Sequence, residues 1–456
     1  MGPDYVRPAV DTPAAFRFEE KEAKELANTP WWEQFQDPVL NELIQASIAE
    51  NKDLRIAAAR VEEFAGRFGT TRSQLFPQIG YEAVVSRDRA SERLATRLPS
   101  GVRNPQTTLE ALLTASWEID LWGRIRRLTE AAHADLLASE EARRGVILSL
   151  VAAVASGYVN LLDLDKQLDI AQRTVQTREE AVELFEVRYE GGVVSELELA
   201  QVRSEYEAAL AEVPRLERAI AQSENAISIL LGRNPGPILR GRSVDELEVP
   251  EIPAGLPSDL LERRPDIREA EQNLVAANAQ IGAARALYFP TISLTGLLGF
   301  ASEELSDLFG GSARTWSFAG NVVGPIFTGG GIKGTVLQAE AQQRQLLAAY
   351  ERAIQTGFGE VDDALIDNRK SRERLTIQGR QVSALANYAQ LARMRYEGGY
   401  TSYLEVLDAE RSLFNAELGY AQTQAEVFNA LINIYKAIGG GWVTEADSFT
   451  GPISAY

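Results

Sequence analysis

Several residue types that build reactive sites are scarce or missing in this chain. Its 456 residues include no cysteine and one histidine, His133. The lack of cysteine excludes disulfides and thiol chemistry, and a lone histidine argues against a histidine-based metal or catalytic centre. No nucleotide-binding glycine motif is present either. We therefore expect no catalytic residue, no metal site and no cofactor, and we assign His133 no role.

Basic residues and long apolar runs are also in short supply. The 46 Lys and Arg residues face 65 Asp and Glu residues, for a net charge of −19. Because nucleic acid requires a basic face, no nucleic-acid partner is expected. The nearest approach to an apolar span covers residues 145–162, which Ser149, Ser156 and Asn160 interrupt. This composition predicts a buried helix face rather than a membrane-spanning helix.

One motif occurs twice in the chain. Residues 188–198 and residues 395–405 both begin Arg-Tyr-Glu-Gly-Gly and both end in glutamate. The paired glycines, Gly191-Gly192 and Gly398-Gly399, can take the left-handed conformation that ends a helix. Each copy follows one long helical pattern and precedes another. Each is therefore interpreted as the turn of a long helical hairpin.

Helix signals surround both turns. Ser195 with Glu198, and Ser402 with Glu405, have the S-x-x-E spacing that predicts a capping box. The preceding pattern, from Gly123 to the first turn, has no proline, and ~65 residues at 1.5 Å each give a rod of roughly 100 Å. Because no globular core requires such a helix, coiled-coil packing is expected.

The helix after the first turn contains Pro214. A proline inside a helix removes one backbone hydrogen bond and clashes with the preceding turn. The sequence therefore predicts a kink or break at this position.

Four stretches alternate with the period of two that is typical of strands. In the clearest, residues 109–121, apolar residues face one way and mostly polar residues the other, and Trp117 and Trp122 lie at its end. A strand whose apolar residues face outward, whose polar residues face inward and whose end carries aromatic residues is typical of a membrane barrel. A half-buried strand in a soluble sheet is the alternative. The other three alternating stretches are residues 79–85, 292–300 and 316–326. The segments that join the paired strands, residues 87–107 and 301–315, are expected to be extracellular loops.

The patterns follow the same order in both halves of the chain. Asp53 to Pro77 matches Asp266 to Pro290 with the same separation. We therefore predict a tandem duplication, each half being helix, two strands, long helix, turn and helix. The expected parts are an extended N-terminal arm over 1–36, a first structural repeat over 37–232, a linker over 233–257, a second repeat over 258–441 and a C-terminal tail over 442–456.

Four strands in one chain cannot close a membrane barrel, because known barrels start at about eight strands. Open strand edges cannot lie in lipid, where their backbone groups would stay unpaired. If these strands enter a membrane, several chains must therefore share one barrel. Three chains would supply twelve strands, continued by twelve helix columns.

Residues 256–267, Leu-Pro-Ser-Asp-Leu-Leu-Glu-Arg-Arg-Pro-Asp-Ile, form a motif of a known family. They resemble the TolC-like outer-membrane efflux channels, especially the OprM-like lipoprotein branch. The resemblance extends over residues 3–442. Further motifs that carry it are residues 117–124, 281–286 with 289–290, 407–413 and 439–442.

The resemblance implies a homotrimer with a mainly α fold and a β-barrel part. A 12-stranded barrel in the outer membrane of a Gram-negative bacterium would continue as a long periplasmic α-helical tunnel. The implied function is a passive exit duct of a tripartite efflux pump for drugs or other small molecules, gated at the periplasmic helix tips. The implied partners are a periplasmic adaptor (membrane fusion) protein, an inner-membrane transporter of RND type and outer-membrane lipids.

Residues 3–8 resemble the start of the mature family lipoproteins, which carry an acylated cysteine a few residues earlier. This chain has no such cysteine. We expect that it was removed with the signal sequence, so an N-terminal lipid is implied by the resemblance alone.

Carried over by position, the tunnel constriction comprises Leu404 and Asp408, with Arg411 one turn on. Three copies of Asp408 around an axis would make an acidic ring that attracts cations. The alternative is an ordinary Asp–Arg pair at i, i+3 on a helix surface. Glu405 matches a position that is acidic in some relatives' inner gates, and its capping role explains it equally well.

Tyr396 and Thr401 match tip positions that hold helices together in some relatives. Thr401 stands where one branch of the family has arginine, so the salt-bridge latch of that branch is not carried over. The turns at Gly191-Gly192 and Gly398-Gly399 also mark where a partner's helical hairpin would meet the tunnel end. Helix termination alone would explain these glycines as well.

Two other classes of protein fit parts of the sequence. A fibrous coiled-coil scaffold would explain the long helices, but it would not explain the alternating strands with terminal tryptophans. An enzyme would have to rely on carboxylate chemistry, and no cleft-forming domain is evident. The efflux duct explains both the helices and the strands.

Overall fold

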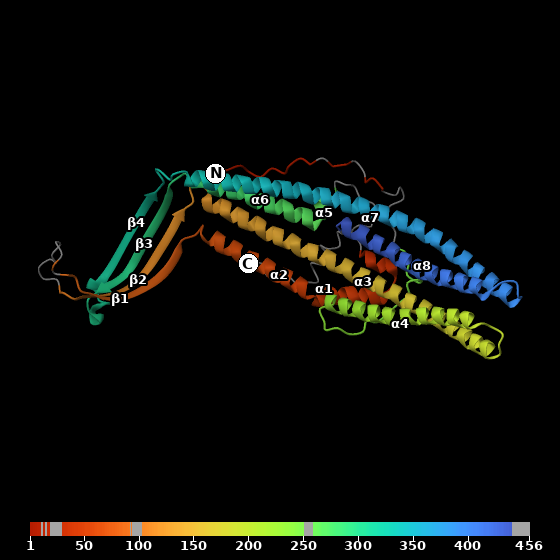
Figure 1. Ribbon diagram of the computed structural model, residues 1–456. Helices are drawn as coiled ribbons and strands as arrows, with labels where there is room; N and C mark the ends of the chain where they lie inside the picture. The colour runs from red at the N-terminus through yellow and green to blue at the C-terminus, as the bar shows by residue number, and fades with distance from the viewer. Residues whose placement is uncertain are drawn as a thin grey trace.

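The protein is elongated, with a sheet at one end and helical hairpins that point away from it (Figure 1). The computed structural model describes residues 1–10, 12–13, 16–18, 30–91, 93, 103–249 and 259–439. The C-terminal tail predicted over 442–456 lies outside these ranges, as do parts of the predicted arm, linker and first loop.

Four antiparallel strands form one sheet in the order β1-β2-β3-β4. Their bounds are β1 Gln78–Asp88, β2 Gln106–Ile119, β3 Thr291–Ser302 and β4 Arg314–Val323. Within the described part of the chain, β1 and β4 each leave one edge without a partner. The alternation predicted as far as Ile326 was wrong at its end, because β4 stops before Gly324 and Pro325.

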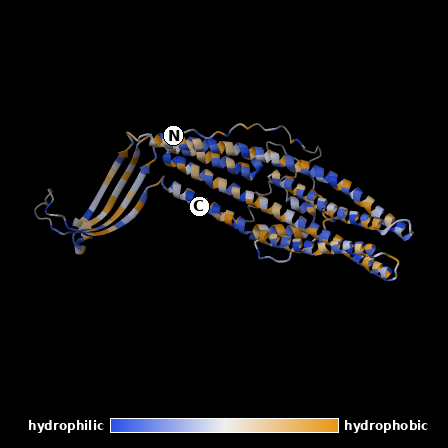
Figure 2. Ribbon diagram, viewed as in Figure 1, coloured by the Kyte–Doolittle hydropathy of each residue, from blue (hydrophilic) through white to orange (hydrophobic). Residues whose placement is uncertain are grey.

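One face of the sheet is apolar and exposed. The register places Leu113 between Tyr81 and Leu298, and Ala111 between Ala83 and Phe300, all on this face. The opposite face carries Glu82, Thr114 and Ser116 among others, so apolar and polar residues are interspersed along each strand (Figure 2). The exposed large apolar residues of this face are Ile79, Tyr81, Val85, Leu113, Trp117, Leu294, Leu298, Trp316, Phe318 and Val322. Such a continuous apolar face requires a non-aqueous environment or a partner.

The helices come in pairs of equal length. The order α2-β1-β2-α3-α4 recurs as α6-β3-β4-α7-α8. The pairs are α2 Lys52–Ser73 and α6 Pro265–Ala286 with 22 residues each, α3 Arg124–Glu190 and α7 Gly331–Glu397 with 67 each, and α4 Glu196–Leu230 and α8 Tyr403–Ala437 with 35 each. The shorter helices are α1 Pro38–Glu50 and α5 Leu260–Arg263, and the 3-10 turns are η1 Trp31–Phe35, η3 Leu305–Asp307 and η4 Gly311–Ala313.

The structure corrects two local predictions about helix continuity. The one helix predicted at the start of the first repeat is two helices, because Asn51 ends α1 and its side-chain oxygen caps α2 by accepting from the backbone N–H of Leu54 at 2.9 Å. Of the kink or break predicted at Pro214, the break was wrong, since α4 runs through this residue. Val213 and the buried Leu216 pack with Ile170 of α3 on either side of the proline. This packing maintains the helix despite the lost hydrogen bond.

Helix α3 lies at the centre of the helical body. It packs against α2, α4, α6 and α8, and 24 of its 67 residues are buried. Helix α7 packs mainly against α6 and α8, and 8 of its 67 residues are buried. The two long helices therefore differ in position: α3 is enclosed, whereas α7 forms one edge of the chain and α2 with α4 forms the other.

Helix α3 also contains the apolar stretch noted in the sequence. Of the described helices, it alone is long and apolar enough to cross a membrane, by length and composition. Of its most apolar window, 61 % is buried inside the protein. This burial is that of a core helix, as predicted for residues 145–162.

Irregular segments are fastened to the helices. The arm follows α6, where Tyr5 donates to Glu271 at 3.1 Å and Asn278 donates to the Pro3 carbonyl at 3.0 Å. Residues 233–249 contain no helix or strand, yet they bury Ile238, Val244 and Leu247 in the main core. Both segments therefore brace the helical body.

Candidate functional site

The site predicted at the hairpin tips lies at the end of the protein farthest from the sheet (Figure 1). Both glycine turns have the same backbone geometry. Gly191 and Gly398 keep helical φ values of −77° and −76°, whereas Gly192 and Gly399 have φ values of 71° and 77°. A side chain at the second glycine would have free space but a strained backbone.

The two copies of the repeated motif cap their helices differently. In the first copy Ser195 and Glu198 form the predicted capping box, in which the Ser195 N–H donates to Glu198 at 2.8 Å. These bonds lower the pKa of Glu198. The capping box predicted for Ser402 and Glu405 was wrong, since the Ser402 side chain makes no cap bond.

The Glu405 carboxylate has other partners. Arg395 donates to it at 2.7 Å, and the Thr401 hydroxyl also donates to it. The position equivalent to Thr401 in the first copy is Val194, which has no hydroxyl. The difference between the two caps therefore has a local cause, and Glu405 ties the end of α7 to the start of α8.

An aromatic cluster joins the two hairpins near their tips. The ring of Tyr403 lies 4.3 Å from that of Phe185 and 4.9 Å from that of Tyr396, measured between centroids. Arg188 of the first hairpin donates to the Tyr396 hydroxyl at 2.8 Å. Phe185 is fully buried and Tyr403 nearly so. Tyr396 therefore bridges the hairpins, in a cluster that sequence reasoning missed apart from this residue.

The residues predicted for the constriction lie on the first turns of α8. Leu404 is exposed. Asp408 accepts a hydrogen bond from Arg411 at 2.8 Å, and both side chains are about half exposed. Arg411 also approaches Glu205 of α4 at 3.9 Å. Within one chain, Asp408 and Arg411 thus form a surface ion pair, which is worth little by itself.

A charged groove between α3, α7 and α8 lies on the sheet side of the aromatic cluster. Its volume is about 400 Å³, and its lining includes Arg173, Arg178, Arg393, Glu410 and Phe414. Arg178 is buried, lies 3.2 Å from Glu205 and stands over the Phe414 ring. Burial lowers the pKa of Arg178.

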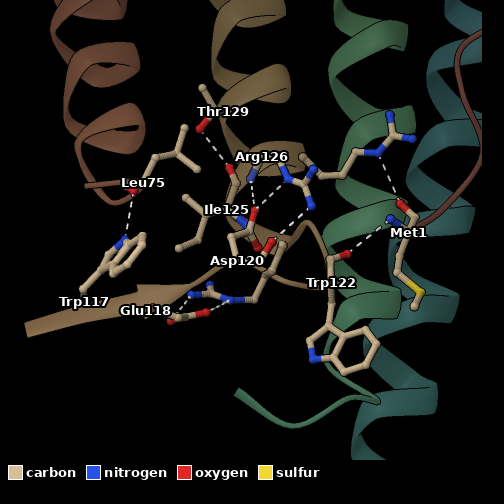
Figure 3. Close-up of polar contacts among 11 residues, drawn as sticks. Met1, Leu75, Trp117, Glu118, Asp120, Trp122, Ile125, Arg126 and Thr129 are labelled. Carbon is tan, nitrogen blue, oxygen red and sulfur yellow. Dashed lines mark hydrogen bonds and ion pairs between the residues drawn. The ribbon is translucent and has the colours of Figure 1, made fainter. Parts of the chain in front are cut away.

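The other end of the helical body is fastened to the sheet by side chains of residues 117–124 (Figure 3). The Trp117 indole donates to the Leu75 carbonyl at 3.0 Å, and the Trp122 indole donates to the Pro290 carbonyl at 2.7 Å. Asp120 accepts from the backbone N–H of Ile125 at 3.0 Å, so it caps α3 where Gly123 has no side chain to do so. This junction fixes where strand gives way to helix.

The structure adds no chemistry to His133. Its exposed side chain lies against the Phe68 ring, with centroids 5.3 Å apart. Among the described residues, no group of three or more His, Cys, Asp or Glu residues is placed to hold a metal ion.

The chain is similar to known efflux proteins and to solved outer membrane channels. A family profile described as outer membrane efflux protein matches residues 43–233 and 256–440. The chain is 38 % identical over 417 residues to the probable efflux pump outer membrane protein TtgC of Pseudomonas putida, covering 91 % of this chain and 86 % of that protein. It is 36 % identical over 456 residues to the cation efflux system protein CusC of Escherichia coli, covering 97 % and 95 %. The open state of the MtrE outer membrane channel of Neisseria gonorrhoeae matches with a TM-score of 0.87 at 33 % identity, over 97 % of this chain and 98 % of that one.

Proposed function

The chain belongs to the outer membrane efflux protein family, and from this we propose that three copies form one exit duct across the outer membrane. The family membership that the resemblance to TolC-like channels implied is confirmed. The protein is an outer-membrane efflux protein with a large periplasmic helical part, as predicted. The proposal adds the trimer, the shared 12-stranded barrel, the gate and the partners.

The two free edges of the sheet are the observation that carries the trimer. A four-stranded sheet with an exposed apolar outer face and unpaired edges cannot lie in lipid alone. Strand β1 of one copy can pair with β4 of the next in the antiparallel sense that the sheet already has. A head-to-tail contact of this kind generates a ring when the rotation closes. Three copies would supply the twelve strands of a closed barrel.

The helices support the same arrangement. Helix α7 follows the β4 edge and is mostly exposed, while α2 precedes the β1 edge. Pairing β1 with β4 would therefore bring α7 of one copy beside α2 and α4 of the next. The central α3 and the exposed α7 are equal in length because they are equivalent parts of two repeats, which is the duplication that we infer.

We place the gate at the start of α8. Arg395 and Thr401 hold Glu405, so Asp408 is the freer carboxylate near the tip and Leu404 the exposed apolar residue beside it. Around a threefold axis the Asp408 carboxylates would converge and repel. Closure would then require Arg411, bound cations or protons as compensation. Such a ring would make the closed tip attractive to cations.

The proposed partners are a periplasmic adaptor, which would meet the tips, and an inner-membrane transporter of RND type. The tips carry exposed apolar side chains, Val193 and Leu197 on one turn and Tyr400 on the other. Such residues suit contact with the apolar stripe of a helical hairpin. The cargo would be drugs or other small molecules, in keeping with relatives named as efflux proteins.

An N-terminal lipid would fit the position of the arm. The Met1 amino group donates to the Trp122 carbonyl at 3.3 Å, beside the junction of sheet and helices (Figure 3). An acyl chain on a residue preceding this point would therefore lie level with the end of the strands. This placement would put it near the membrane interface.

The mass of the protein in detergent tests the assembly. With a chain of 50.1 kDa, we expect a protein mass of about 150 kDa by light scattering after subtraction of detergent. A stable 50.1 kDa species that retains its full β content would contradict the shared barrel.

A further inference from the structure

Polar side chains line the contact between α3 and α8, midway along the helical body. Asn429 donates to Asn160 at 2.8 Å, and Gln422 donates to Gln167 at 3.4 Å. These two rungs show that the helices run antiparallel in a fixed register. The α3–α8 ladder consists of Asn160, Asp163 and Gln167 on α3 and of Gln422, Glu426 and Asn429 on α8.

The middle rung brings two carboxylates together. Asp163 is 8 % exposed, and its Oδ2 accepts from Gln167 at 2.8 Å. Its Oδ1 is buried without a hydrogen-bond partner among the described residues. The register of the two rungs places Glu426 of α8 opposite Asp163, and Arg374 of α7 donates to the half-exposed Glu426 carboxylate at 2.8 Å. Asp163 Oδ1, which accepts no hydrogen bond among the described residues, is therefore the atom of this rung that can carry a proton.

Apolar packing encloses this polar layer on both sides. Toward the sheet, Tyr158 and Val159 of α3 belong to the main core together with Ile432 of α8. Toward the tips, Ile170 packs with Phe414 and other residues. A polar layer within an apolar helix contact costs stability but specifies the register of the helices.

The environment of Asp163 favours its neutral form. Burial raises the pKa of Asp163 to about 6, and the Glu426 charge adds to the rise. The bond from Gln167 and the charge of Lys166 act in the opposite direction. Lys166 is itself engaged by Asp245 at 2.5 Å. The charged groups that face Asp163 are therefore Lys166 on its own helix and Glu426 on α8.

We propose that the α3–α8 ladder is a proton-controlled joint between the two halves of the chain. With a proton on Asp163 Oδ1, the Asp163–Glu426 rung is a hydrogen-bonding pair that holds α8 in register on α3. Without that proton, two like charges face each other and the rung loosens. Asp163 is thus a positioning residue for α8.

The joint is mechanically connected to the tip. Helix α8 is unbroken from Tyr403 to Ala437 and carries Leu404 and Asp408 at its start. Gln422 lies 14 residues beyond Asp408, or about 21 Å along a helix. A change of register at the ladder therefore shifts the start of α8. The link to a gate rests on the proposed function, whereas the joint itself does not.

The direction of the pH dependence follows from the raised pKa. The stabilising effect is complete below 3.8, the ordinary value, and is lost as the pH rises through about 6. Asp163→Asn mimics the protonated carboxyl and cannot titrate. The unfolding temperature of the variant should therefore exceed that of the wild type by more near pH 7.5 than near pH 5.

The unfolding temperature of the intact protein in detergent, measured at both pH values, tests the joint. The matched control is Asp169→Asn, on the same helix but exposed and paired with Arg173. Glu426→Gln removes the facing charge, so it should move the pH dependence to lower pH. Equal destabilisation by Asp163→Asn at both pH values, or an effect no larger than that of Asp169→Asn, would overturn the proposal.

A second readout is the conductance of the channel in a planar bilayer. The wild-type conductance should change between pH 5 and pH 7.5, and that of Asp163→Asn should stay constant. If the unfolding temperatures follow the prediction but no channel forms, the joint stands and the proposed function fails. If channels form but Asp163→Asn keeps the wild-type pH profile, the coupling of the joint to the tip is wrong.

Discussion

Removal of the Tyr396 hydroxyl should loosen the closed tip. The Arg188–Tyr396 bond, 2.8 Å long, is the described hydrogen bond that ties the first hairpin to the second at the aromatic cluster. A bond from a charged donor contributes about 1.5–3 kcal/mol, and partial exposure reduces this to about 1 kcal/mol. If three copies open together, the loss is about 3 kcal/mol, or over a hundredfold in the closed-to-open ratio.

Single-channel recording in planar bilayers measures this shift, and Tyr396→Phe should open more often than the wild type. The chain supplies its own control in Tyr189, the equivalent residue of the first repeat. Its side chain is exposed, and its hydroxyl has no hydrogen-bond partner in the described ranges. Tyr189→Phe should therefore behave as the wild type. The reasoning would be refuted if both variants opened equally often, or if Tyr396→Phe opened no more often than the wild type.

Two further predictions concern the tip and the caps. Asp408→Ala should reduce cation selectivity and block by multivalent cations, because it removes the proposed ring; wild-type selectivity would place the constriction elsewhere. Ser195→Ala should cost about 1 kcal/mol and lower the unfolding temperature, because it removes a cap bond that the structure contains. Ser402→Ala should cost less, since Ser402 makes no such bond; equal losses would contradict the difference between the caps.

The periodic elements of the fold could be predicted from the sequence. The helix expected from Gly123 to Tyr189 is α3, Arg124–Glu190, and the alternating stretch predicted over 109–121 lies in β2 as far as Ile119. Both patterns are local, since a helix or strand displays its own period along the chain. The sheet face predicted to be apolar is therefore the exposed apolar face of the structure.

Individual side-chain contacts could not be predicted in this way, whether the partners are near or far apart in the sequence. The S-x-x-E spacing is the same at Ser195 and Ser402, but Arg395 and Thr401 bind the Glu405 carboxylate and Ser402 makes no cap bond. Phe185 and Tyr403 meet across more than 200 residues of sequence, and so do the rungs of the α3–α8 ladder. Such pairs depend on how whole helices pack, which local spacing does not encode.

Intermolecular cross-linking of β1 to β4 tests the shared barrel most directly. The chain has no cysteine, so one can be placed at Ala83 on β1 and a second, in turn, at each position of β4 from Thr315 to Val323. Within one chain two strands separate β1 from β4, a distance of about 14 Å, which no disulfide can span. We predict that some pairs yield covalent trimers on non-reducing gels. Monomers alone across the whole series would contradict the barrel shared by three chains.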